Sequence, residues 1–199
     1  MCYLTQPDPC PNGFPLTATS TPYDLTVSRL ITAHKDRQGL SLTPHLADRL
    51  ARSVAFLLGQ SRVGGRPVIL VPVPSATAAV RERGFDATGA LARAAAHRLR
   101  PRFEVQACPA LTQTRRVPDQ VGLGAAARRH NLSGGLRVSR RPPAGAVVII
   151  VDDVVTTGTS LTEAARTLRA ARIAVLGAAT VAATVRFRPS RPARRREVP

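Results

Sequence analysis

The sequence predicts an α/β fold in which a central, mostly parallel sheet is flanked by helices. Short runs of apolar residues alternate along the chain with longer segments whose apolar residues recur every three or four positions. The clearest run, Val147 to Val151, consists of five consecutive β-branched residues, which is typical of a strand buried on both faces. Such strand–helix alternation favours a parallel sheet, whose ligands bind at the carboxyl ends of its strands.

The first part of the chain predicts a loose segment followed by two helices. Residues 1–21 are rich in proline and threonine and are expected to be loose. Helices are predicted over about 23–34 and 43–58. The second helix rests on an apolar stripe at helical spacing, formed by Leu46, Leu50, Val54 and Leu57.

The middle and the end of the chain continue the alternation. A strand is predicted over 67–73, and Asp86 is expected to cap the helix that follows. A short strand at 103–107 and a helix at 119–130 come next. After the strand that begins at Val147 and its helix, a last strand is predicted over about 173–184.

Acidic and hydroxyl residues follow the strand at Val147 directly. Asp152 and Asp153 stand at its carboxyl end, and the small, hydroxyl-rich loop 156–160 leads into a helix in which Ser160 and Glu163 have capping-box spacing. Free backbone N–H groups and the helix dipole make such a helix start an anion site. The acids suit sugar hydroxyls or a divalent cation, so the combination predicts a ligand with both a phosphate and a ribose.

Other classes of strand–loop–helix site fit less well. An ATPase with this strand as its Walker B element would also need a Walker A loop, but the only lysine, Lys35, has no such loop around it. No G-x-G-x-x-G motif follows any strand, so a dinucleotide fold is not supported. A strand–turn–helix with a purely structural role stays open as the alternative.

Residues 148–160 resemble the phosphoribosyl pyrophosphate (PRPP) signature of type I phosphoribosyltransferases, in which two acids separate apolar residues from a Thr/Gly/Ser loop. The resemblance implies a type I phosphoribosyltransferase fold. It also implies that Asp152 and Asp153 hold the 2′ and 3′ hydroxyls of the ribose. The residues that would wrap the 5′-phosphate are Thr156, Thr157, Gly158, Thr159 and Ser160.

Further segments resemble the ComF family, which is named for competence proteins. They are Val71–Ser75 followed by Arg81–Phe85, the stretch Leu111–Leu136, and Tyr23–Lys35 as the family's first helix. The chain departs from the family at three places: Asp86-Ala87 stands where Asn-Gln is expected, Gln113 and Val117 stand where Arg and Thr are frequent, and the four-cysteine zinc ribbon of many members is missing.

The same resemblance assigns a second loop to the pyrophosphate. Pro74, Ser75 and Ala76 would bind it, because prolines here impose a rigid turn that directs free amides inward. Arg81 and Arg83 would close over the leaving group on a mobile segment. The alternative is a proline-rich turn with solvated arginines.

The predicted activity is phosphoribosyl transfer from PRPP to an unidentified acceptor, with release of pyrophosphate. The catalytic residues would be Asp152, Asp153, Arg81 and Arg83, and no protein nucleophile is required. The cofactor would be Mg²⁺, held mainly by PRPP and water because the chain offers few carboxylates, so no metal ligand is assigned. The alternative is a non-catalytic PRPP- or nucleotide-sensing protein, or a DNA-binding competence protein.

The net charge and the composition indicate which classes of partner are compatible with the chain. The 199 residues carry a formal net charge of +17, which suits PRPP and equally suits nucleic acid. The ComF resemblance adds single-stranded DNA or a competence helicase as possible partners, and an oligomer is compatible with the sequence. The chain is expected to comprise the loose segment 1–21, one domain over 22–185, and a disordered tail over 186–199 with six arginines.

Three scattered cysteines are too few for a disulfide framework or a Cys₄ zinc site. The first basic residue is Arg29, so the start lacks the charged region of a signal peptide. The longest apolar run, residues 173–185, is too short to span a membrane. A cytoplasmic protein without a membrane partner is the expectation.

Overall fold

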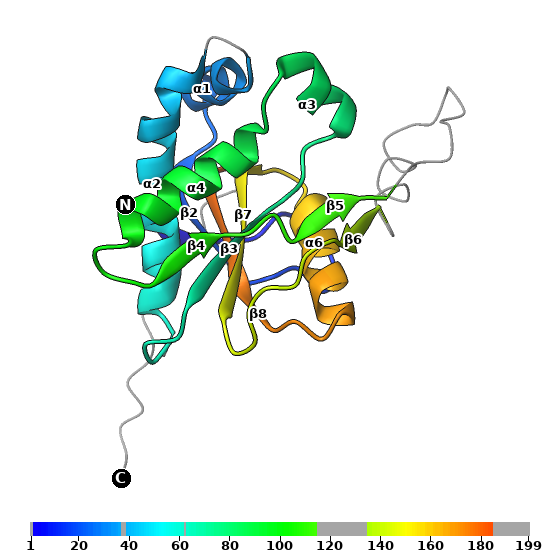
Figure 1. Ribbon diagram of the computed structural model, residues 1–199. Helices are drawn as coiled ribbons and strands as arrows, with labels where there is room; N and C mark the ends of the chain where they lie inside the picture. The colour runs from blue at the N-terminus through cyan, green and yellow to red at the C-terminus, as the bar shows by residue number, and fades with distance from the viewer. Residues whose placement is uncertain (1, 37–38, 62, 115–134, 185–199) are drawn as a thin grey trace.

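The computed structural model describes residues 2–36, 39–61, 63–114 and 135–184. In these residues the main sheet has the strand order β1–β2–β8–β7–β3–β4 (Figure 1). Strand β1 is antiparallel to β2, and all other neighbours are parallel. The strands are β1 (Tyr3–Thr5), β2 (Thr17–Pro22), β3 (Val68–Pro72), β4 (Val105–Ala107), β7 (Val147–Val155) and β8 (Val175–Ala183).

Helices cover both faces of this sheet. Helices α2 and α4 pack on one face, while α6 packs on the other, where it contacts β6 of the small antiparallel sheet β5–β6. Within the described ranges, no helix has the length and apolar character needed to cross a membrane. The remaining elements are α1 (Leu25–Lys35), η1 (Gly39–Leu42), α2 (Thr43–Gly59), α3 (Thr77–Arg83), α4 (Ala87–Leu99), β5 (Leu111–Gln113), β6 (Leu136–Val138) and α6 (Thr159–Ala170).

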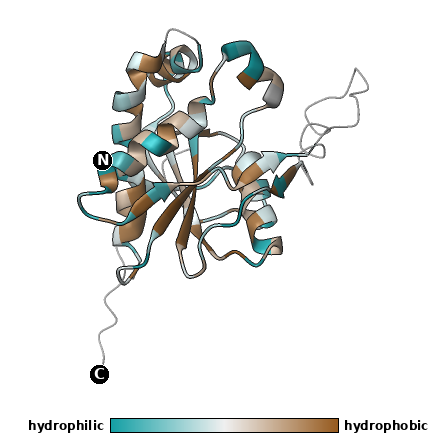
Figure 2. Ribbon diagram, viewed as in Figure 1, coloured by the Kyte–Doolittle hydropathy of each residue, from teal (hydrophilic) through white to brown (hydrophobic). Residues whose placement is uncertain are grey.

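Strand β7 is the centre of the core. Its side chains alternate between the two faces: Ile149 joins the cluster beneath α2 and α4, and Ile150 joins the cluster beneath α6. Val147 to Val151 are all buried, as expected for a strand inside a parallel sheet. Figure 2 shows the result as apolar strands at the centre of the molecule with the polar residues toward its outside.

Most of the predicted elements are confirmed, with boundaries shifted by no more than two residues except at β7. That strand continues four residues past the predicted Val151, so Asp152 and Asp153 lie within it rather than directly after it. Asp86 caps α4 as expected, since its Oδ1 accepts the Gly89 N–H at 3.1 Å. The short elements η1, α3, β5 and β6 were not predicted, because three to seven residues carry too little periodicity. The helix predicted over 119–130 and the tail 186–199 lie outside the described residues.

The expectation of a loose segment over 1–21 is wrong. Strand β2 is an interior strand between β1 and β8, and its Ala18 and Thr19 are fully buried. The loop between β1 and β2 is held against α6, because Arg169 Nη1 donates a hydrogen bond to the Gly13 carbonyl at 2.9 Å. Threonine fits a pleated strand as well as an apolar residue does, so polar composition concealed the strand. The domain therefore begins before residue 22.

Phe14 offers a test of this packing. Its ring is partly buried against the α6-side cluster, so Phe14→Ala should lower the free energy of unfolding by about 1–3 kcal/mol. Leu16→Ala, at a position 49% exposed in the same segment, should change it by less than about 0.5 kcal/mol. Urea unfolding of both variants measures the difference. Two near-neutral substitutions would mean that the segment is loose after all.

Candidate functional site

The candidate site lies at the carboxyl edge of the main sheet. Strands β3 and β7 pair in parallel with Pro72 opposite Val151, and the Val73 N–H donates to the Val151 carbonyl at 2.9 Å. The loops that follow these two strands are therefore neighbours. Helix α1 follows β2 at the same edge, and Figure 1 shows α1 and α3 both lying beyond the end of β7.

The two acids of the signature occupy different environments within β7. Asp153 is buried, and its Oδ2 lies 2.6 Å from Lys35 Nζ at the end of α1. Asp152 is partly exposed, and its Oδ1 accepts the backbone N–H of Asp153 at 2.9 Å. The sequence indicated Lys35 only as part of a helix, because nothing in the spacing of residues 35 and 153 connects them.

Asp152 has an unfavourable electrostatic environment. Desolvation and the neighbouring Asp153 raise the pKa of Asp152 well above its ordinary value, while the Asp153 N–H and Lys35 lower it by less. Across the sheet Asp152 is in register with Thr180, which is in register with Thr19. Both threonine hydroxyls are buried and have no hydrogen-bond partner among the described residues. This side of the sheet thus offers buried hydroxyl groups in register with Asp152.

The hydroxyl-rich loop ends in an uncapped helix start. Helix α6 begins at Thr159, and the residue before it, Gly158, has no side chain with which to cap it. Thr157 and Thr159 hydrogen-bond to each other through their hydroxyls at 2.9 Å. The first-turn amides of α6 remain available, and together with the helix dipole they form an anion site.

Gly158 is required at this turn for two reasons. Its φ of +73° lies in the left-handed region, which costs other residues about 1–2 kcal/mol. A Cβ at this position would also lie 2.7 Å from the ring of Phe14 and 2.8 Å from Pro7. The N-terminal segment therefore supports the loop from behind, a contact that the sequence did not predict.

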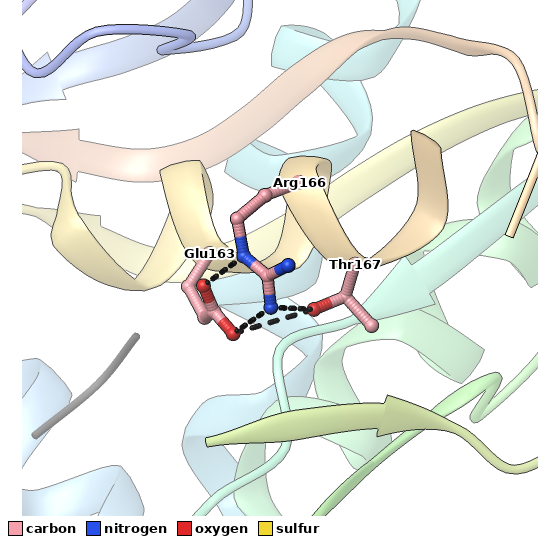
Figure 3. Close-up of polar contacts among 3 residues, drawn as sticks. All are labelled: Glu163, Arg166 and Thr167. Atoms are coloured by element: carbon pink, nitrogen blue, oxygen red, sulfur yellow. Dashed lines mark hydrogen bonds and ion pairs between the residues drawn. The ribbon is translucent and has the colours of Figure 1, made fainter. Parts of the chain in front are cut away.

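The predicted capping box is wrong. Ser160 lies inside the first turn of α6 rather than before it, so its spacing to Glu163 has no capping role. The Glu163 carboxylate instead accepts two hydrogen bonds from Arg166, at 2.7 and 2.8 Å, and lies next to Thr167 (Figure 3). The cause is the left-handed Gly158, which starts the helix two residues earlier than a cap at Ser160 would.

The loop after β3 places the other predicted residues at the same edge. Pro74, Ser75 and Ala76 connect β3 to the short helix α3. Arg81 of α3 is exposed, whereas Arg83 is partly buried, with its Nε lacking a hydrogen-bond partner among the described residues.

Helix α3 ends at Arg83 and is capped by Gly84, whose φ of +79° lies in the left-handed region. The structure thus brings the two predicted loops together along adjacent strands. Arg81 and Arg83 stand on the segment that follows one of them.

The donor set does not fit a metal ion held by the protein alone. In the part of the chain that the structure describes, no three of His, Cys, Asp and Glu form a group that could bind one. Of the two acids at the site, Asp153 is already paired with Lys35.

Comparisons with known proteins place this geometry in context. Residues 36–198 match the model of the phosphoribosyl transferase domain. Over 152 residues, the chain is 31% identical to the DNA utilization protein YhgH of Salmonella typhi. The aligned residues cover 70% of this chain and 65% of that protein. The chain thus spans somewhat less than two thirds of this relative's length.

The raised pKa of Asp152 predicts a pH-dependent cost in stability. Between the unfolded-state pKa, about 3.9, and the higher folded-state pKa, the folded protein binds more protons than the unfolded chain, so its stability falls as the pH rises through this window. Asp152→Asn cannot ionise and keeps the oxygen that accepts from Asp153. It should raise Tm at pH 7–8, by about 2–4 °C for each kcal/mol gained.

Calorimetric melting of the protein and of this variant from pH 4 to 8 measures the effect. The gain should shrink toward pH 4, because the folded-state carboxyl is protonated there and the unfolded-state carboxyl, with a pKa of about 3.9, is about half protonated. Asp8→Asn, at an exposed position in the N-terminal loop, serves as the control and should give no such trend. A constant or negative difference for Asp152→Asn would contradict the assignment.

Proposed function

The chain belongs to the phosphoribosyltransferase family, as a ComF-like member of type I, and on that premise we propose that it binds PRPP at the edge formed by β3 and β7. The proposed activity is transfer of the phosphoribosyl group to an acceptor, with release of pyrophosphate. One observation carries the proposal: two adjacent acids, of which Asp153 is buried and paired with Lys35, are followed within a few residues by a helix start without a side-chain cap. That juxtaposition matches a ribose with a phosphate at its 5′ position.

Each part of PRPP has a matching group in this site. The 5′-phosphate would lie in the loop 156–160, on the first-turn amides of α6. The ribose hydroxyls would donate to the carboxylates of Asp152 and Asp153. The pyrophosphate would extend toward Pro74–Ala76, because this loop follows the strand next to β7.

Positioning and charge stabilisation would supply the catalysis. Displacement at the anomeric carbon passes through a cation-like state, so the chain needs to hold the ring and stabilise the leaving oxygens. Arg81 and Arg83 are the cations of α3, and they would act on the pyrophosphate. Mg²⁺ would arrive bound to the pyrophosphate oxygens and water, since the acids here do not form a metal site of their own.

A second candidate function is DNA binding without turnover. It is favoured by the name of the relative, a DNA utilization protein, and by the net charge of +17. Sequence-independent binding to phosphates would weaken steeply as salt rises. Single-stranded DNA is the polymer to test, with affinity measured over a range of salt concentrations.

The first prediction concerns the acid pair. Asp152→Asn combined with Asp153→Asn should abolish PRPP binding while the protein stays folded, because two hydrogen bonds from ribose hydroxyls to charged acceptors are weakened together. Titration calorimetry with PRPP and MgCl₂ measures the affinity, and a thermal melt verifies folding. If a folded double variant binds PRPP as the unaltered protein does, the site is misassigned.

The second prediction concerns Arg81 and Arg83, and it distinguishes binding of the pyrophosphate from binding of the ribose 5-phosphate part of PRPP. Arg81→Gln with Arg83→Gln should weaken PRPP binding at least tenfold, since a charge-assisted hydrogen bond contributes about 1.5–3 kcal/mol. The affinity for ribose 5-phosphate, which has no pyrophosphate, should stay within about twofold.

Arg93→Gln, an exposed change on α4, is the matched control and should alter neither affinity. An equal loss for both ligands would place the two arginines away from the pyrophosphate.

A further inference from the structure

The last turn of α1 contacts both sides of the candidate site. Lys35 reaches Asp153 with its ammonium, and the lysine side chain remains 37% exposed while that of Asp153 is 6% exposed. The preceding residue, His34, is fully buried, and its ring stands edge-on to Phe85 with centroids 6.1 Å apart. Phe85 directly follows Gly84, where α3 ends. Lys35 and His34 thus connect α1 to the acid pair and to the residues that directly follow α3, respectively.

This turn has little freedom to move. A Cβ at Gly39 would overlap the Ala33 carbonyl oxygen and His34 Cα, so the backbone of η1 lies directly on the end of α1. His34 Nε2 and Thr43 Oγ1 are hydrogen-bonded at 3.0 Å, which fixes the same turn to the start of α2. The backbone of the turn that carries Lys35 is therefore held by close packing and by a partly buried hydrogen bond.

The charges explain why a cation is needed here. Two adjacent carboxylates at the end of a buried strand repel each other, and an anionic sugar phosphate adds further negative charge. Asp153 and Lys35 are the charged groups that act on Asp152, and the same two act on His34. Burial lowers the pKa of His34, which favours its neutral form and leaves Lys35 as the cation of this turn. The α3–α4 junction contributes the uncharged ring of Phe85 to this turn.

We propose that Lys35 is a positioning residue for the acid pair: it orients the Asp153 carboxylate and offsets part of the pair's negative charge, so that both acids can accept ribose hydroxyls from a phosphorylated ligand. The inference rests on the proposed function, because it assigns the ligand to the same site. It goes beyond that function by placing a residue of α1, far from the signature in sequence, among those that prepare the site.

The test compares three variants of α1. Lys35→Met removes the charge and keeps the length of the side chain, and it should weaken binding of PRPP with MgCl₂ about tenfold to a hundredfold. Lys35→Arg keeps the charge and should recover most of that loss. Arg29→Met removes one positive charge from an exposed position of the same helix and should bind as the unaltered protein does.

A second readout needs no ligand. Lys35 lowers the pKa of Asp152, so carbon-13 NMR titration of the Asp152 carboxyl should show a higher pKa in Lys35→Met than in the unaltered protein or in Arg29→Met. A lysine with only a structural role would leave this titration unchanged. Lys35→Gln provides a second neutral variant should Lys35→Met fail to fold.

The outcomes separate the two proposals. Absence of PRPP binding by the folded, unaltered protein overturns the proposed function, and the titration then decides the effect of Lys35 on the acid pair by itself. Unchanged affinity together with an unchanged Asp152 titration in a folded, neutral variant overturns the role of Lys35. Weakened binding that Lys35→Arg restores, with a raised pKa of Asp152, supports it.

Discussion

Much of this structure depends on one electrostatic constraint, which is the presence of two adjacent carboxylates at the end of a strand buried on both faces. Strand β7 lies between β8 and β3, so solvent reaches its acidic end less than it would reach an edge strand. Repulsion and desolvation make that arrangement costly. Lys35 from α1 and the backbone amide of Asp153 lower part of the cost, and the rest is visible as the raised pKa of Asp152.

The neighbourhood of β7 follows from this arrangement. On one side α1 must end at the acids, which fixes the turn through η1 into α2. On the other side the chain must leave β7 and start a helix at once, which requires a glycine at 158 with a positive φ. Phe14 and Pro7 pack against that glycine, so the N-terminal segment supports the loop 156–160.

Sequence reasoning succeeded where local chemistry decides the outcome. The β-branched run of β7 predicted a buried strand, and Asp86 predicted the start of α4, because each signal lies within a few residues of its effect. It failed where a local pattern had two solutions. Ser160 and Glu163 have capping-box spacing, but the backbone starts the helix earlier, and Glu163 pairs with Arg166 instead. The threonine-rich start of the chain suggested a loop because its strand buries hydroxyl-bearing side chains beside other strands.

The sequence alone determined the class of fold, the location of the acids and of the hydroxyl loop on consecutive elements, and the resemblance to phosphoribosyltransferases. These depend on the order of residue types along a short segment, which the sequence states directly. The tertiary structure alone decided that Lys35 pairs with Asp153, that His34 contacts Phe85, and that Phe14 supports Gly158. Each of these contacts joins residues far apart in the chain, and their meeting depends on strand order and helix packing, which local propensity does not specify.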